Sequence, residues 1–209
     1  MASTSTGRRV LSVDIGVKTT CAVLLDAGPS RPDGWTVLDF RVNMGPAEGA
    51  KATTYDVGAE VARQVTAMAR EGEATEVVVE QQNRNNPNAF TIAGIVLYAC
   101  ARDLPGVRYR SIGATAKDAV FKEHASAGGK GRKAQSVRCA VRILEARAEA
   151  EGAEVWDVEK RLLAWLSRGG IPKKDDLADA FVQGLAAIAP KKTRKRKAKA
   201  QATPAETED

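Results

Sequence analysis

Apolar residues in the first half of the chain recur in short runs that predict β-strands. The runs are rich in Val, Leu and Ile, and turn sequences such as "DAGPSRPDG" interrupt them. The run "TEVVVE" is continuously apolar between its acidic ends, which is typical of a central strand buried on both faces of a sheet. The predicted strands are residues 8–14, 20–25, 35–42, 75–80 and 106–112.

Between and after these runs, apolar residues recur at helical spacing. Residues 54–71, for example, place Val57, Val61, Val65 and Met68 on one stripe. The other predicted helices are residues 88–103, 113–124, 134–151, 154–169 and 171–188. Because three strands precede two helix–strand repeats, we expect an α/β fold. Its mixed five-stranded sheet combines an antiparallel three-strand meander with two parallel strands, and helices cover both faces.

Length and composition indicate one domain of ordinary size. The 209 residues are 44% apolar, enough for a core, and no stretch is long and apolar enough to span a bilayer. The start, "MASTSTGRRV", lacks the apolar segment of a secretory signal. Three widely spaced cysteines without CxxC spacing favour a reducing, intracellular environment. Viral, phage, nuclear and organellar origins all stay open.

The positive charge is concentrated near the C-terminus. Residues 190–209 hold seven Lys or Arg against three acids, which accounts for +4 of the net charge of +6. A polyanion-binding surface on the remainder must therefore be a local patch. We expect a flexible N-terminus over residues 1–8, one domain over 9–189 and a disordered tail over 190–209. The tail segment "KKTRKRKAKA" fits either nonspecific nucleic-acid binding or nuclear import.

Carboxylates end two of the predicted strands. Asp14 closes the first strand and Glu80 closes the fourth. A carboxylate at the end of a nearly apolar strand is costly to bury without a partner, although each could instead sit in a solvated turn. Since the two strands are expected to be neighbours, their ends can converge.

A third group of acids opens the last predicted helix, "KKDDLADAFVQG". Asp175, Asp176 and Asp179 share one helix face, and Asp179 lies too deep in the helix for a simple capping role. Carboxylates without paired His or Cys ligands favour Mg²⁺ or Mn²⁺, and two such ions suit phosphodiester hydrolysis. His124 is the only histidine, which excludes a His-rich metal site. A surface position at the end of a helix, without a role in the site, is an equally good interpretation of His124.

The segments "SVDIGVKTTCAVLL", "VVVEQQ" and "KKDDLADAFVQG" resemble the motifs of ribonuclease H-like Holliday junction resolvases, of the RuvC-like and poxvirus–mitochondrial branch. The resemblance spans residues 9–188 and implies a ribonuclease H-like fold. It further implies a metal-dependent, structure-selective DNA endonuclease that resolves four-way junctions by paired symmetric nicks, leaving 5′-phosphate and 3′-hydroxyl ends, in recombination, replication or repair. Under it, Asp14, Glu80, Asp176 and Asp179 are catalytic acids that bind two Mg²⁺ or Mn²⁺ ions, and Asp175 is a cap or lies behind the ligands.

The resemblance also assigns a lysine after the fifth strand. Lys117 is the best match and could stabilise charge on the transferred phosphate, although an exposed helix lysine is the alternative. Lys133 matches a second basic position, but the preceding loop is longer than is usual in the family.

Two segments are candidates for DNA contacts. Six Lys or Arg and a single acid occur between Lys122 and Arg142, around a glycine-rich stretch that could follow phosphates or could form an ordinary solvated face. The amide-rich segment after Glu80, "QQNRNNPNAF", could bond phosphates and sugars, or Asn86 and Asn88 could serve as caps. The candidate DNA-binding residues are Gln81, Gln82, Asn83, Arg84, Lys122, Lys130, Arg132 and Lys133.

The family comparison also implies a homodimer acting on four-way junctions or other branched DNA, with no membrane and no nucleotide cofactor. The helix "FTIAGIVLYACA" is the candidate interface, or ordinary core. A sugar kinase or chaperone-type ATPase would need a second phosphate motif and a longer chain. A ribonuclease H-like nuclease acting on RNA, flaps or branched DNA stays open, as does an inactive DNA-binding module.

Overall fold

The computed structural model describes residues 7–28, 34–46, 51–124, 131–151, 157–169 and 173–189. Within these residues every predicted strand and helix occurs, with ends displaced by a few residues. The strands are β1 (Arg8–Asp14), β2 (Cys21–Ala27), β3 (Thr36–Arg41), β4 (Glu76–Glu80) and β5 (Arg108–Ile112). The helices are α1 (Thr54–Glu71), α2 (Pro87–Asp103), α3 (Lys117–His124), α4 (Arg132–Glu151), α5 (Asp157–Ser167) and α6 (Lys174–Ile188).

One predicted helix begins with a different kind of turn. The helix expected from residue 113 begins with a 3₁₀ turn over Ala114–Ala116, and the α-helix starts only at Lys117. The predicted domain bounds include Arg8 in the flexible N-terminus, whereas the predicted first strand begins with it; in the structure Arg8 is the first residue of β1. The tail over 190–209 lies outside the described residues, so the proposed domain bounds stay a prediction. In the part of the chain described, no helix has the length and apolar content needed to cross a membrane.

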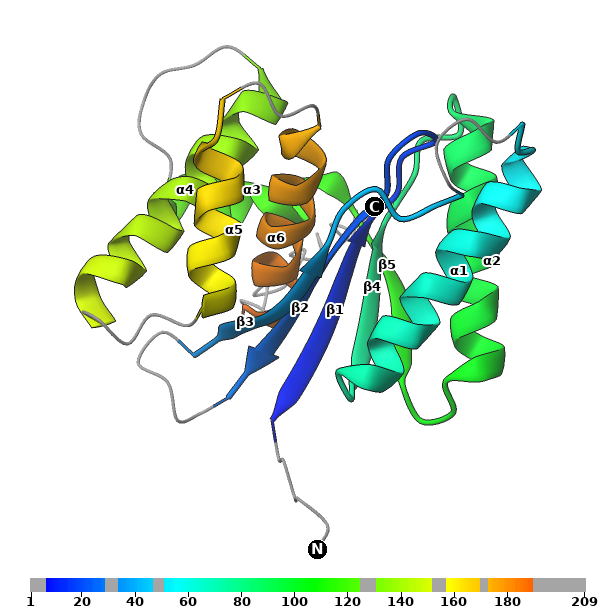
Figure 1. Ribbon diagram of the computed structural model, residues 1–209, viewed down its shortest axis with the longest axis horizontal. Helices are drawn as coiled ribbons and strands as arrows, with labels where there is room; N and C mark the ends of the chain where they lie inside the picture. The colour runs from blue at the N-terminus through cyan, green and yellow to red at the C-terminus, as the bar shows by residue number, and fades with distance from the viewer. Residues whose placement is uncertain are drawn as a thin grey trace, which may run out of the picture.

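The five strands form one mixed sheet in the order β3-β2-β1-β4-β5. β1, β2 and β3 are an antiparallel meander, whereas β1 pairs with β4 and β4 with β5 in parallel. The predicted fold class is therefore confirmed. Figure 1 displays α1 and α2 to one side of the sheet and α3 to α6 to the other.

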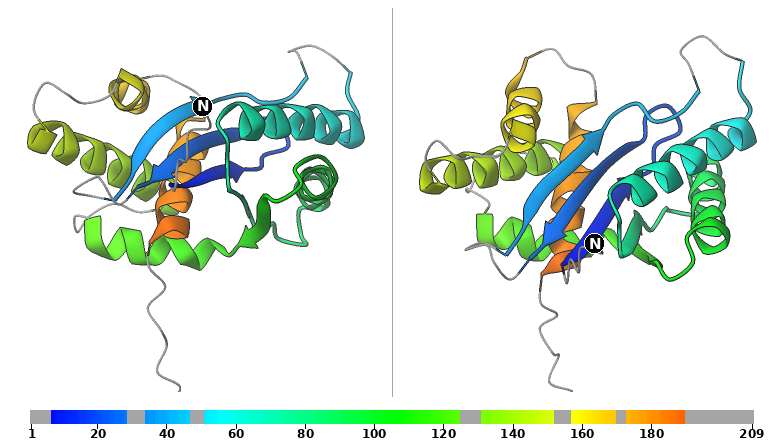
Figure 2. Two further views of the ribbon diagram at one scale, coloured as in Figure 1. Left: turned by 90° about the horizontal axis from the view of Figure 1, so that it is seen from below. Right: turned by 60° about the horizontal axis from the view of Figure 1, so that its bottom comes forward.

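Apolar side chains that point alternately to the two faces of the strands build a separate core on each face of the sheet. Leu11 and Val13 of β1 join the apolar cluster under α1 and α2, while Val10 joins a small cluster on the opposite face. On β2, Val23 and Leu25 pack with α4, α5 and α6. Successive residues of a strand point to opposite faces, so two helical layers can share one sheet. Both layers are visible in Figure 2.

Helix α6 lies unusually close to β1. The buried amide of Gln183 donates from Nε2 to Ser12 Oγ at 3.1 Å and to the Val13 carbonyl at 3.2 Å. A Cβ at Gly184 would lie 2.6 Å from Leu25 Cδ1 and 3.2 Å from Ser12 Cβ, so a larger residue would require the Leu25 side chain or the helix to shift. These contacts fix the acidic first half of α6 relative to the end of β1.

A buried carboxylate also sits at the opposite edge of the sheet, where β4 begins. Glu76 is 1% exposed, and it accepts bonds from Arg8 Nη2 at 2.6 Å and from Arg110 Nε at 2.6 Å. Burial would raise the pKa of Glu76, but the two guanidinium groups outweigh it and hold that pKa below its ordinary value. The pair of arginines thereby ties β1 and β5 to β4, the strand that lies between them.

We expect Glu76→Gln to lower the free energy of unfolding by about 2–3 kcal/mol, because charged hydrogen bonds are lost and two guanidinium groups lose their counter-ion. Because the folded pKa is depressed, this stabilisation is complete above the ordinary glutamate value of 4.5 and is lost as the pH falls below it. Urea unfolding at several pH values measures the difference.

The exposed pair of Glu60 with Arg63, 2.6 Å apart on α1, supplies the control. Glu60→Gln should change the unfolding free energy by about 0.5 kcal/mol or less. Equal effects of the two substitutions would contradict a structural role for Glu76.

Candidate active site

Asp14 and Glu80 end neighbouring parallel strands at one edge of the sheet. Val13 pairs with Val79, so the next residue of each strand, Asp14 and Glu80, ends beside the other. Asp14 is buried and Glu80 is half-buried, so Asp14 is not a solvated turn residue. Gly16 is required just after Asp14, because a Cβ there would collide with the Thr19 carbonyl oxygen.

Helix α6 brings its acids to the same edge. Lys173 is the N-cap in a left-handed conformation, with φ of 63°, and the helix starts at Lys174. Asp176 lies buried in the first turn and accepts a 2.6 Å hydrogen bond from Thr19 Oγ1 of the β1–β2 turn. Asp179 lies one turn further along the helix, and its carboxylate faces Lys117.

Lys117 is the cation at the centre of the acidic cluster. Its Nζ lies 3.0 Å from Asp179 Oδ1 and 3.3 Å from Glu80 Oε1, and its side chain is 6% exposed. Burial would lower the pKa of Lys117, but Asp179, Glu80 and Asp14 outweigh it and raise that pKa. The alternative of an exposed helix lysine is therefore wrong, and the lysine is held in its charged form.

The pKa of Asp14 is raised well above its ordinary value. Burial is the largest cause, followed by the charge of Glu80, a side-chain hydrogen bond with Glu80 and the charge of Asp179, while Lys117 opposes the shift. Asp14, Glu80 and Asp179 thus face a single ammonium group, that of Lys117, so the cluster carries more negative charge than Lys117 neutralises.

These carboxylates fit a hard divalent cation by their chemistry, because oxygen donors with excess negative charge are what Mg²⁺ and Mn²⁺ prefer. In this structure Glu80 and Asp179 are arranged around the ammonium group of Lys117. Over the described residues, no three acidic, His or Cys side chains already converge as they would around a metal ion. Lys117 Nζ, within 3.3 Å of both Glu80 and Asp179, contacts two of the four proposed ligands.

Asp175 does not cap α6, because the N-cap is Lys173. It lies in the first turn, where the helix dipole favours an acid, and accepts a 2.6 Å contact from Lys133 Nζ. Burial would raise the pKa of Asp175, but Lys133 outweighs it and lowers that pKa. Lys133 also lies 3.8 Å from Asp176 Oδ1, so it is next to the acidic cluster, and its match to the family's second basic position stays a prediction.

The remaining basic candidates lie on α3 and at the start of α4. Lys122 is an exposed residue of α3. Arg132, the first residue of α4, is exposed and pairs with Asp118 at 2.6 Å. Lys130 lies outside the described residues. The two described helix starts thus bring Lys117, Arg132 and Lys133 to one region beside α6.

The amide-rich segment joins β4 to α2 directly after Glu80. Its candidate DNA contacts are Gln81, Asn83 and Arg84, which are exposed, and Gln82, which is half-buried. Asn86 caps α2 by accepting a backbone N–H, and Asn88 Oδ1 accepts from Thr54 Oγ1 at 3.2 Å. The capping alternative is thus confirmed for Asn86.

Two hydroxyl residues that hold the acids were not found from the sequence. Thr19 bonds Asp176, and Ser136 Oγ lies 2.6 Å from Asp179 Oδ1. Thr19 lies within the first family-like segment, but no role is assigned to it there, and the only signal for Ser136 is that it is three residues from Lys133 on the same helix.

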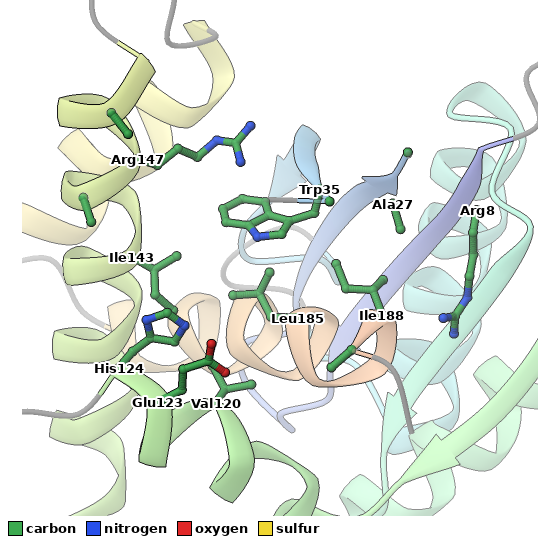
Figure 3. A pocket seen from close by; sticks show the side chains of 15 residues that line it. Arg8, Ala27, Trp35, Val120, Glu123, His124, Ile143, Arg147, Leu185 and Ile188 are labelled. Atoms are coloured by element: carbon green, nitrogen blue, oxygen red, sulfur yellow. The ribbon is translucent and has the colours of Figure 1, made fainter. Parts of the chain in front are cut away.

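A cavity of about 840 Å³ lies elsewhere, between the β2–β3 hairpin, α3, α4 and the C-terminal end of α6. Figure 3 displays Trp35, His124 and Leu185 in its lining. None of the four proposed metal ligands lines it. His124, half-buried at the end of α3, is therefore separate from the acidic cluster.

Comparison with known proteins supports the fold. The structure of Thermus thermophilus RuvC matches with a TM-score of 0.54 and 16% identity over 86% of this chain and 93% of that one. The same protein in complex with a Holliday junction substrate matches with 0.54 and 14% identity over 87% and 93%. The yeast mitochondrial Holliday junction resolvase Ydc2 matches with 0.57 and 15% identity over 87% and 79%.

No family model matches the chain, and no curated protein matches it. The structural likeness establishes that the chain has the ribonuclease H-like fold of these resolvases, as the motifs predicted. At these identities it establishes the fold alone.

In the absence of divalent cations, we expect Asp14→Asn to raise the free energy of unfolding at neutral pH. The substitution removes a buried charge that Glu80 and Asp179 oppose, and each unit by which the pKa of Asp14 is raised corresponds to about 1.4 kcal/mol. Because the folded pKa is raised, the penalty is absent at low pH and grows as the pH rises above the ordinary value of 3.8.

Thermal and urea unfolding in EDTA measure this effect. Asp39→Asn on β3, where the carboxylate is 43% exposed, is the control and should change stability by about 0.5 kcal/mol or less. A large loss of stability in Asp14→Asn would mean that Lys117 fully compensates the acids.

Proposed function

We propose that this chain is a metal-dependent, structure-selective DNA endonuclease that resolves four-way junctions. The observation that carries the proposal is the convergence of Asp14, Glu80 and Asp179 on the buried Lys117 at the carboxyl edge of the sheet. The fold is that of RuvC and Ydc2, which supports the same class of reaction.

Asp14, Glu80, Asp176 and Asp179 would hold Mg²⁺ or Mn²⁺, most simply two ions. Bound there, the ions would activate the attacking water and stabilise the leaving 3′ oxygen, so the products are a 5′-phosphate and a 3′-hydroxyl. Lys117 would turn from the acids toward the scissile phosphate and stabilise its developing charge. Its present contacts with Glu80 and Asp179 keep the ammonium charged and beside two of the proposed metal ligands.

The DNA surface we infer surrounds this edge. Arg132 and Lys133 lie on one side, at the start of α4, and the segment from Gln81 to Arg84 follows Glu80 on the other. Basic and amide side chains bind phosphates and sugars without reading sequence, as selection of branched DNA by shape requires. RuvC has been solved with a Holliday junction substrate, which supports branched DNA as the substrate class here.

Paired nicks need two active sites, so we infer that the chain acts as a homodimer. The candidate helix α2 buries one face in the core: Ala89, Ile92, Ala93, Val96, Ala99 and Cys100 are its buried residues. Core packing therefore explains that face. Its other side carries Phe90 and Tyr98, which are 54% and 67% exposed, and this side is where we place the second copy.

The decisive experiment is a nicking assay with Mg²⁺ or Mn²⁺ on a mobile four-way junction, a flap, a linear duplex and an RNA/DNA hybrid. We expect paired, symmetric nicks on the junction and none in EDTA. Asp14→Asn and Asp179→Asn should each reduce the rate by about a hundredfold or more, because each removes a carboxylate that would bind the catalytic metal ions.

Equal cleavage of the RNA/DNA hybrid or the flap would assign the chain to another ribonuclease H-like nuclease. Tight junction binding without cleavage under any metal would indicate an inactive binding module. Unpaired nicks would contradict the homodimer while leaving the nuclease in place.

We expect the double variant Arg132→Ala/Lys133→Ala to bind junction DNA more weakly at every sequence. The slope of log affinity against log salt should fall by about 1 for each phosphate group that the variant no longer neutralises. Fluorescence anisotropy over a range of salt concentrations gives both values.

Arg63→Ala is the control for this change. Arg63 is an exposed arginine paired with Glu60 on α1, away from the acidic cluster. If it altered the salt slope as much as the double variant does, the binding surface would lie elsewhere.

A further inference from the structure

We propose that Ser136 is a positioning residue for Asp179, and that its hydroxyl sets how tightly the acidic cluster holds a divalent cation. The inference rests on the proposed function, because it concerns the same site. It adds a residue that neither the motifs nor the resemblance assigns.

The contact is short and buried. Ser136, on α4, is 1% exposed, and its Oγ lies 2.6 Å from Asp179 Oδ1 on α6. The same hydroxyl lies 3.4 Å from the Arg132 carbonyl. A serine has only one hydrogen to donate, and the shorter, charge-assisted bond to a carboxylate is the stronger. The hydrogen is therefore given to Asp179.

Two donors from different helices meet at a single oxygen of Asp179. Lys117 of α3 contacts Oδ1 at 3.0 Å, and Ser136 of α4 contacts the same atom at 2.6 Å. Neither of these two contacts occupies Oδ2. A carboxylate held through one oxygen keeps its rotamer while the other oxygen binds a ligand, so less freedom is lost on binding.

The two donors differ in what a divalent cation does to them. The ammonium of Lys117 is itself a cation, so a metal ion at Asp179 repels it and competes for the same carboxylate. The hydroxyl of Ser136 is neutral and can keep its bond while the metal binds. Ser136 is thus the donor that still holds Asp179 in the loaded site.

The competing explanation is that Ser136 is an ordinary helix hydroxyl that bonds its own backbone. Thr66 on α1 provides that case within the same chain. It is 4% exposed, and its Oγ1 donates to the Arg63 carbonyl at 3.1 Å. Thr66→Val therefore removes a buried helical hydroxyl without touching any acid of the cluster.

The test is a titration of the full chain with Mn²⁺ alone, without DNA. Mn²⁺ binding is measured by calorimetry or by electron paramagnetic resonance. Ser136→Ala should weaken Mn²⁺ binding by about 10- to 100-fold, as loss of a partner behind a metal ligand commonly does. Ser136→Thr keeps the hydroxyl and should restore binding, and Thr66→Val should leave it unchanged. In junction cleavage, Ser136→Ala should raise the Mn²⁺ concentration for half-maximal rate, with the KM for DNA unchanged.

Wild-type Mn²⁺ affinity in Ser136→Ala would overturn this inference while leaving the proposed function intact. Absence of any Mn²⁺ binding that depends on Asp179, judged with Asp179→Asn, would instead overturn the proposed function. If the alanine variant does not fold, Ser136→Cys makes the same comparison, because a thiol of similar size is only a weak donor.

Discussion

The structure depends on one constraint, that several carboxylates must be held close together at a sheet edge where burial limits their hydration. Asp14 is buried beside Glu80, and Asp179 approaches from a helix on one face of the sheet. Like charges repel strongly where burial lowers the effective dielectric constant, so the folded protein needs a cation among these carboxylates. Lys117 supplies it, and the raised pKa of its ammonium follows from the same three acids.

The packing of α6 in the core also sets the positions of the acids that the helix carries. The helix approaches β1 closely because Gly184 has no Cβ, and the Gln183 amide bonds Ser12 and the Val13 carbonyl in the interior. Val13 directly precedes Asp14, so one buried amide fixes the helix against the strand that carries the first acid. Any change that lifts α6 therefore also separates Asp179 from Asp14.

The sequence predicted those features whose cause is local. Strand ends at Asp14 and Glu80 followed from apolar runs, and the topology followed from the order of elements. The contacts of Thr19 and Ser136 could not be predicted, because each joins residues far apart in the chain, 157 and 43 positions respectively, through a hydroxyl to which no motif assigns a role. Of the two roles expected for Asp175, only the cap is excluded, because Lys173 is the N-cap of the helix in the left-handed conformation; Asp175 pairs with Lys133 instead.

Buried acids at the two edges of the sheet have opposite electrostatic surroundings. At one edge Glu76 faces two arginines, so its charge is fully matched and its pKa is lowered. At the other edge three carboxylates face one lysine, and the pKa of Asp14 is raised. A buried carboxylate whose only role is to stabilise the fold would be paired with enough cations to match its charge, as Glu76 is with two arginines. The unbalanced edge lowers the stability of the protein on its own, and under the proposed function the binding energy of a divalent cation would offset that cost.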